Sequence, residues 1–218
     1  MRDSSGKPAT GEACEDLQRI ARPEAIAKGH ALTLIFETCK KSLFLLIMIR
    51  TLQGKTPVIG QNCFITENSV ILGDVIMGDE CSVWFNVVIR GDVHSIRIGN
   101  RTNIQDGAIL HCTYKKFSLT IGNNVSIGHG AIVHGCVIED NVLIGMGAKV
   151  LDGAIIRKNS IIAAGAVVLP NTEVPEGSLF AGNPATFKKQ LDEKAIAFLQ
   201  QSADNYVMYK EWYSGETW

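Results

Sequence analysis

The chain has 218 residues, with 21 Lys and Arg against 22 Asp and Glu, so its net charge is −1 at pH 7 and no charge excess favours nucleic acid or an anionic membrane. This length allows one good hydrophobic core with a modest extra element at each end. The six cysteines form no CxxC pair, which is typical of reduced thiols in an intracellular protein, and the longest apolar run, Leu43–Ile49, is too short to span a membrane. We therefore expect a cytoplasmic protein with neither nucleic acid nor membrane as a partner.

Residues 1–50 carry no repeat and are predicted to form an N-terminal extension. Met1–Thr10 is polar, and we expect it to be disordered. Because Met48 stands shortly before the first repeat, a second interpretation is that the natural start lies there. The intact mass of protein from native cells would distinguish the two interpretations.

From Ile59 to Leu179 an aliphatic residue recurs at every sixth position, as in Ile59, Ile65, Ile71, Met77, Val83 and Ile89. Extra residues interrupt this register at 95–97 and at 112–120. A period of six fits neither an α-helix nor a long strand, but it fits short strands separated by tight corners, three to a coil. Residues 51–185 are therefore predicted to form an all-β solenoid, a parallel β-helix in which the aliphatic residues line the interior.

After Gly182-Asn183-Pro184-Ala185 the period becomes helical. The apolar residues at this spacing are Phe187, Leu191, Ala195, Phe198, Leu199, Tyr206 and Tyr209. We expect residues 186–213 to form an amphipathic helix that packs along the solenoid, followed by a short tail at 214–218. Trp84 and Phe85 lie outside the inward ladder, so either this helix or a second copy of the chain is expected to cover them.

Three histidines lie close together in the repeat. His111 and His134 each follow an inward aliphatic residue, and His129 follows Ile127 by two. Three neutral imidazoles around one divalent cation would leave a fourth position for water, as in catalytic zinc sites. The alternative is that these side chains are exposed at polar corners and bind nothing.

Four polar residues precede His111 in the neighbouring repeats, namely Arg90, Asp92, Gln105 and Asp106. Metal sites need hydrogen-bonding groups that orient the ligands and the bound water, and these residue types can fill that role. A carboxylate beside an arginine can equally be a structural ion pair.

The segments RGDVHSIRIGNRTNIQDGAILH, IGHGAIVHGC and IGMGAKVLDGAII resemble the γ-class carbonic anhydrase family, and the resemblance extends over residues 50–213. It implies a left-handed β-helix and a homotrimer with metal sites at the subunit interfaces, holding Zn²⁺ (or Fe²⁺/Co²⁺). The ligands it implies are His111 and His134 of one chain with His129 of its neighbour.

The same resemblance implies roles for the polar residues. Gln105 would hydrogen-bond the metal-bound hydroxide, and Arg90 and Asp106 would form an ion pair between subunits. Asp92 would belong to the same polar shell, and Tyr206 aligns with a tyrosine near the site.

The chain departs from the archetypal active members of that family at three places. Val93 stands where they have a glutamate after the Arg-x-Asp, Met208 replaces an asparagine, and the stretch after His111 contains no acid. Glutamates at the first and third of these places carry protons away from the metal in the family. Because each turnover must release a proton, we expect weak turnover.

Three functions follow. The first is hydration of CO2 to bicarbonate by a metal-bound hydroxide, with CO2 and bicarbonate as small-molecule substrates. The second is a hexapeptide acyltransferase or a thioesterase acting on a CoA thioester, suggested by the coils and the Gly-Asn-Pro-Ala ending. The third is a scaffolding role for the trimer and its metal.

Overall fold

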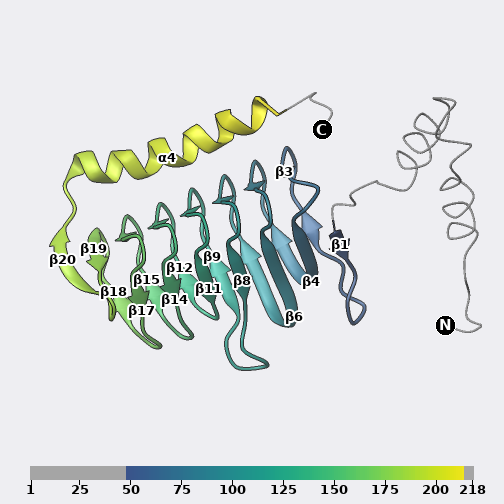
Figure 1. Cartoon of the computed structure of the whole chain (residues 1–218), viewed down its shortest axis with the longest axis horizontal. Coiled ribbons are helices and arrows are strands. Elements are labelled where there is room, and N and C mark those ends of the chain that lie inside the picture. The colour runs from purple at the N-terminus through teal and green to yellow at the C-terminus, as the bar shows by residue number, and fades with distance from the viewer. Residues whose placement is uncertain (1–47, 214–218) are drawn as a thin grey trace, which may run out of the picture. The chain divides into compact units, whose positions relative to one another are not determined.

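The computed structural model describes residues 48–213. The predictions made for residues 1–47 and for the tail at 214–218 lie outside this range. Within it, short strands stack side by side along the long axis, and one helix runs back along a flank of the stack (Figure 1). No helix of this described part is long and apolar enough to cross a membrane.

Two sheets build the stack, and every strand pair in them is parallel except β19 with β20. The twelve-stranded sheet contains β1 (Met48–Arg50), β2 (Val58–Ile59), β4 (Val70–Met77), β6 (Val88–Ile98), β8 (Ile109–His111), β9 (Leu119–Ile121), β11 (Ile132–His134), β12 (Val137–Ile138), β14 (Lys149–Val150), β15 (Ile155–Ile156), β17 (Val167–Val168) and β18 (Glu173–Val174). The eight-stranded sheet contains β3 (Phe64–Ile65), β5 (Ser82–Val83), β7 (Asn103–Ile104), β10 (Ser126–Ile127), β13 (Leu143–Ile144), β16 (Ile161–Ile162), β19 (Ser178–Ala181) and β20 (Thr186–Gln190).

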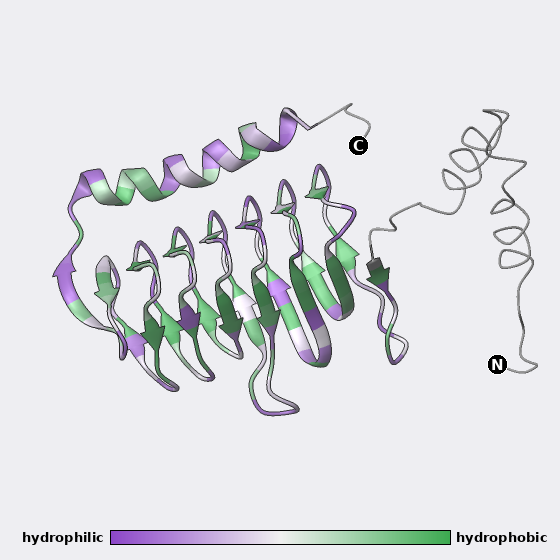
Figure 2. Ribbon diagram, viewed as in Figure 1, coloured by the Kyte–Doolittle hydropathy of each residue, from purple (hydrophilic) through white to green (hydrophobic). Residues whose placement is uncertain are grey.

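The inward aliphatic residues form continuous ladders because successive coils pair in register. One ladder is fully buried and consists of Ile71, Ile89, Leu110, Val133, Val150 and Val168. Burying each such side chain contributes about 1.5–3 kcal/mol. Figure 2 shows the apolar residues concentrated on the strands and the polar ones at the corners. The fold is the parallel β-helix of hexapeptide repeats that the six-residue period predicted, and it matches the left-handed form that the family resemblance implied.

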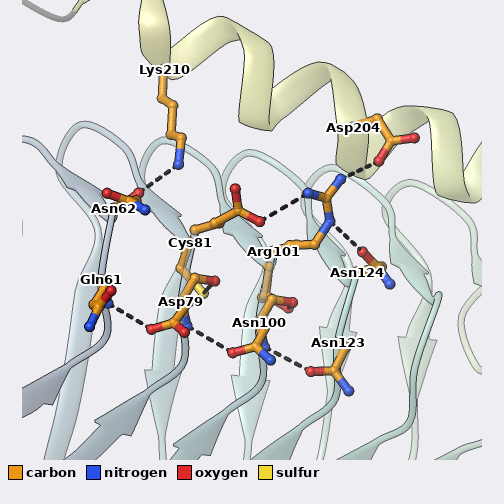
Figure 3. Close-up of polar contacts among 12 residues, drawn as sticks. Gln61, Asn62, Asp79, Cys81, Asn100, Arg101, Asn123, Asn124, Asp204 and Lys210 are labelled. Atoms are coloured by element: carbon orange, nitrogen blue, oxygen red, sulfur yellow. Dashed lines mark hydrogen bonds and ion pairs between the residues drawn. The ribbon is translucent and has the colours of Figure 1, made fainter.

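Asparagines turn many of the corners. Six of them have a φ between 53° and 59°, a region that asparagine tolerates better than most residues: Asn62, Asn86, Asn124, Asn141, Asn159 and Asn171. Beside them, side-chain oxygens cap the preceding coil, since the backbone N–H groups of Gln61, Asp79 and Asn100 donate to the side chains of Asp79, Asn100 and Asn123 (Figure 3). These bonds fix the spacing of the coils at this edge.

One corner is longer than the others in two successive coils, at residues 90–95 and 111–118. Residues 72–74, 90–95 and 111–118 occupy equivalent places between paired strands, and the pairing of β4 with β6 shifts there. β4 and β6 pass through this corner as unbroken strands, which joins two faces of the three-sided solenoid into one sheet. The interruptions of the repeat in the sequence therefore correspond to local extensions of one corner.

The C-terminal helix α4 (Glu193–Glu211) begins later than the helical spacing predicted. Residues 186–190 form β20 instead, because the open edge of β19 offers backbone partners, and Asp192 then caps the helix by accepting from the N–H of Ala195 at 2.8 Å. Leu199 and Ala203 are buried, whereas Phe187 and Phe198 are exposed. Only part of the expected apolar face is therefore buried.

The helix is anchored to the coils by polar contacts and aromatic rings. Arg101 pairs with both Glu80 and Asp204, and the buried Lys210 donates to the carbonyl of Asn62 at 2.5 Å (Figure 3). Trp84 packs edge-on against Tyr206, with ring centroids 5.7 Å apart. Trp84 was expected to be covered by the C-terminal helix or by a second copy of the chain, and within this chain α4 covers it.

Candidate active site

His111 and His134 lie side by side on adjacent coils. They are direct register partners at the ends of β8 and β11, so both side chains leave the coil in the same direction. His111 Nδ1 lies 3.1 Å from His134 Nε2, and the ring centroids are 5.0 Å apart. The equivalent repeat positions found in the sequence thus bring two imidazoles together.

A carboxylate occupies the other nitrogen of each ring. His111 Nε2 is 3.0 Å from Asp92 Oδ1, and His134 Nδ1 is 2.6 Å from Asp152 Oδ1. Arg90 pairs with the second oxygen of Asp92, and the hydroxyl of Thr113 donates to Asp152 Oδ2 at 2.7 Å. In the neutral rings this places the protons on the outer nitrogens and leaves two lone pairs facing each other across 3.1 Å.

Two facing lone pairs without a shared proton favour a cation between them, so this pair fits a metal such as zinc. Burial lowers the pKa of His111, which favours the neutral ring that a metal requires. Burial opposes ionisation of Asp92, but hydrogen bonds from His111 and Arg90 lower its pKa overall. The carboxylate therefore stays charged while the imidazole stays neutral.

Asp152 was not predicted from the sequence. It lies one coil beyond His134, one residue past Leu151, which holds the register position of His134. Burial opposes its ionisation, but hydrogen bonds from Thr113 and His134 lower its pKa overall. Because Asp152 is offset by one residue from that position, the repeat register alone does not identify it.

His129 lies at a different corner. It precedes β11 whereas His134 ends that strand, so about 10 Å of extended chain separates the two corners. There its Nδ1 is 2.7 Å from Asp106 Oδ2. Among residues 48–213, no three His, Cys, Asp or Glu side chains converge on one point that could hold a metal ion.

Gln105 and Tyr206 accompany His129 rather than the histidine pair. Gln105 is 6% exposed, and its amide donates to Asn103 Oδ1 at 3.0 Å. Tyr206 lines a 240 Å³ pocket together with His129, Asp106 and Trp84. Burial and the charge of Asp106 raise the pKa of Tyr206 to about 12, so its hydroxyl keeps its proton at neutral pH.

The predicted site residues thus form two separate groups within one chain. The first, the histidine-pair corner, contains Arg90, Asp92, His111 and His134, to which the structure adds Asp152. The second, the His129 corner, contains Gln105, Asp106, His129 and Tyr206. Within the chain Arg90 pairs with Asp92 and Asp106 with His129, so the ion pair expected between Arg90 and Asp106 of different subunits stays a prediction.

Comparison with known proteins gives the same picture of the repeats. The model for bacterial transferase hexapeptide (six repeats) matches residues 56–91 and 135–170, and that for the hexapeptide repeat of succinyl-transferase matches residues 118–151. A solved hexapeptide transferase family protein from Anaplasma phagocytophilum has 38% identity and a TM-score of 0.72, over 75% of this chain and 96% of that one.

Two curated relatives bear on the site more directly. "Carbonic anhydrase" of Geobacillus kaustophilus is 42% identical over 76% of this chain and 91% of its own length. "Gamma carbonic anhydrase 1, mitochondrial" of Arabidopsis thaliana is 41% identical over 70% of this chain, but the match spans only 57% of the Arabidopsis protein.

Proposed function

The chain belongs to the gamma carbonic anhydrase family of hexapeptide-repeat proteins, and from this premise we propose that it is a metal-dependent carbonic anhydrase that hydrates CO2 to bicarbonate. The observation that carries the proposal is the split of one complete set of site residues between two corners of the chain. The histidine-pair corner lacks a third imidazole, and the His129 corner lacks the other two.

We propose that the two corners meet between copies of the chain. The histidine-pair corner of one copy would receive His129 from the next, and because the two corners differ, the contact is heterologous and can close into a ring. A homotrimer with a metal site at each interface is the arrangement we propose. Zn²⁺, or Fe²⁺ or Co²⁺ in its place, suits three imidazole ligands.

When bound, such a metal with an open coordination position supplies a hydroxide nucleophile from water at neutral pH. The protein's own residues would orient the histidine rings and the attacking water. Asp92 and Asp152 hold the two rings in the tautomer that leaves a lone pair inward. The bond from Gln105 to Asn103 fixes the amide, so that the carbonyl oxygen of Gln105 can accept a hydrogen bond from the attacking water.

Proton release would depend on the solvent. Val93 and the loop at residues 112–118 carry no acid, and the loop presents Lys115 and Lys116 instead. Protons from the reaction would therefore pass to buffer molecules rather than to a carboxylate of the chain. The lack of an acid at these places supports slow turnover of CO2.

The experiment that tests the two-corner site uses metal analysis of mixed assemblies. Wild-type protein should bind about one metal ion per chain, whereas His111→Ala and His129→Ala should each bind almost none. Copies of the two variants refolded together should regain about a quarter of the wild-type metal, because about one interface in four then joins two intact corners.

Full metal binding by His129→Ala alone would contradict a site shared between copies. A His94→Ala variant serves as the control, since the side chain of His94 bonds to Ser95 and to none of the proposed site residues. CO2 hydration measured on the same samples tests the reaction separately: metal-replete protein with no rate above that of buffer would refute the carbonic anhydrase activity but leave the metal site standing.

Acyl transfer is the alternative, favoured by the similarity to the Anaplasma phagocytophilum hexapeptide transferase family protein. In that case, or for a thioesterase, coenzyme A should raise the melting temperature of the protein. Absence of a thermal shift, together with CO2 hydration that depends on metal, would exclude it.

A further inference from the structure

A cavity of about 550 Å³ opens beside the histidine-pair corner and has no part in the proposed reaction. It lies at the corner that residues 90–95 and 111–118 lengthen, beside residues 72–74 of the preceding coil, and the turn at residues 52–55 closes one side of it. Asp92, which holds His111, contributes to its wall. The volume is in the range of pockets that hold small metabolites.

The wall of this cavity has an excess of positive charge. Lys55 and Arg97 both pair with Asp74, at 2.5 Å and 2.8 Å, so a single carboxylate balances two cations. Asp92 is already paired with Arg90, which lies outside the wall. Lys115 also lines the cavity and forms no ion pair within residues 48–213. Two positive charges are thus left without a carboxylate.

His94 adds a hydrogen-bond donor to the same wall. The backbone N–H of Ser95 donates to His94 Nδ1 at 2.8 Å, so the proton of the neutral ring lies on Nε2. A ring held in this tautomer offers an N–H group to an acceptor. The phenol of Tyr114 is a further donor in the wall, and Leu52 and Val93 are apolar.

We propose that this cavity binds a small organic carboxylate. The unbalanced cations would attract its charge, the N–H of His94 would donate to a carboxylate oxygen, and Leu52, Val93 and the Tyr114 ring would contact its carbon skeleton. The same cations would repel a metal ion, and the apolar residues do not favour a fully hydrated ion. The proposal does not depend on whether His111 and His134 hold a metal.

Calorimetric titration of the full chain with succinate tests this site, with neutral succinamide as the comparison ligand. Lys115→Gln should weaken succinate binding by about fivefold or more, because it removes a charge from the wall. Lys116→Gln is the matched control: it makes the same change of charge one residue away, but Lys116 lies over the Phe117 ring and does not line the cavity. Succinate affinity in this control should stay within about twofold of wild type.

His94→Phe is a second variant that keeps a flat ring and removes the donor, and it should also weaken succinate binding. The proposal is overturned if succinate does not bind at about 10 mM, or if succinamide binds equally well. Equal losses in Lys115→Gln and Lys116→Gln would show general charge attraction and overturn it as well. Sulfate binding as tightly as succinate would overturn the assignment to a carboxylate.

Discussion

At the scale of single residues, the pairing of each imidazole with a carboxylate determines what the candidate site can bind. Asp92 and Asp152 accept hydrogen bonds from the outer nitrogens of His111 and His134. Such partners fix the ring orientation and raise the basicity of the inner nitrogen. The structure therefore assigns a function to Asp152 that the sequence motif alone does not reveal.

Asp152→Asn should weaken metal binding by about 10- to 100-fold, because the amide can no longer accept a charge-assisted hydrogen bond from His134. Zinc competition against a chelating dye would measure the affinity. Glu173→Gln removes the same charge from an exposed pair with Arg157 and should leave the affinity unchanged. Unchanged zinc affinity in Asp152→Asn would mean that His134 is oriented by its packing alone.

Asp74 gives a prediction about pH. A hydrogen bond from Lys55 lowers the pKa of Asp74, burial opposes this, and Arg97 adds to the lowering. Since the folded pKa lies below the ordinary value, the ionised carboxylate stabilises the fold above about pH 4, and this contribution is lost as the pH falls through the lower folded pKa.

Asp74→Asn should accordingly reduce the free energy of unfolding at pH 7, and the difference from wild type should shrink towards zero in strong acid. Urea unfolding at pH 7 and in strong acid measures this difference in the free energy of unfolding. Glu67→Gln is a suitable control, because Glu67 forms no ion pair in the described part of the chain. A deficit that is the same at both pH values would show that Asp74 acts by packing rather than by charge.

At the scale of elements, α4 connects the coils to the His129 corner. Its aromatic residues Tyr206 and Tyr209 line the pocket that contains His129, and the polar anchors at Asp204 and Lys210 flank them along the helix (Figure 3). A helix placed by anchors on both sides can hold Tyr206 in a constant position. We therefore expect the docking of α4 to affect the His129 corner as well as the stability of the fold.

Lys210→Met should lower the free energy of unfolding by about 1–3 kcal/mol, because it leaves the carbonyl of Asn62 without its charged donor. Hydrogen exchange of α4 should become faster near residue 210. Lys194→Met, on the exposed first turn of the same helix, should change neither quantity. Unaltered exchange in Lys210→Met would show that the aromatic contacts alone hold the helix.

At the scale of the whole molecule, the separation of the two corners means that the metal binding we propose would be a property of an assembly. His129 and His134 lie at opposite ends of β11, and a rigid coil cannot bring them together. A metal ion that links copies should stabilise the assembly, and the assembly should in turn stabilise the bound metal.

Diluting the metal-loaded protein should therefore release metal and reduce the assembly mass over the same concentration range. Light scattering would follow the mass and a chelating dye the free metal. Adding zinc should shift the dissociation to lower protein concentration. Metal that stays bound to a monomer would contradict the shared site.

The sequence by itself determined the repetitive core and the proximity of two histidines, because in a solenoid each coil contacts the next at a constant separation along the chain. The six-residue period predicted the ladder from Ile71 to Val168, and the equivalent positions of His111 and His134 predicted their proximity. The roles of Gln105 and Tyr206 came from the family resemblance and remain predictions.

Tertiary structure alone decided what happens where the repeat is interrupted. Residues 186–190 became a strand because β19 offered an edge, which no local helical spacing can reveal. The lengthened corner opened a charged cavity around His94 and Lys115, because residues inserted in successive coils add up in space although they are separate in sequence. The separation of His129 from the histidine pair is likewise visible only in three dimensions, because the direction in which a corner side chain leaves the prism depends on which corner carries it.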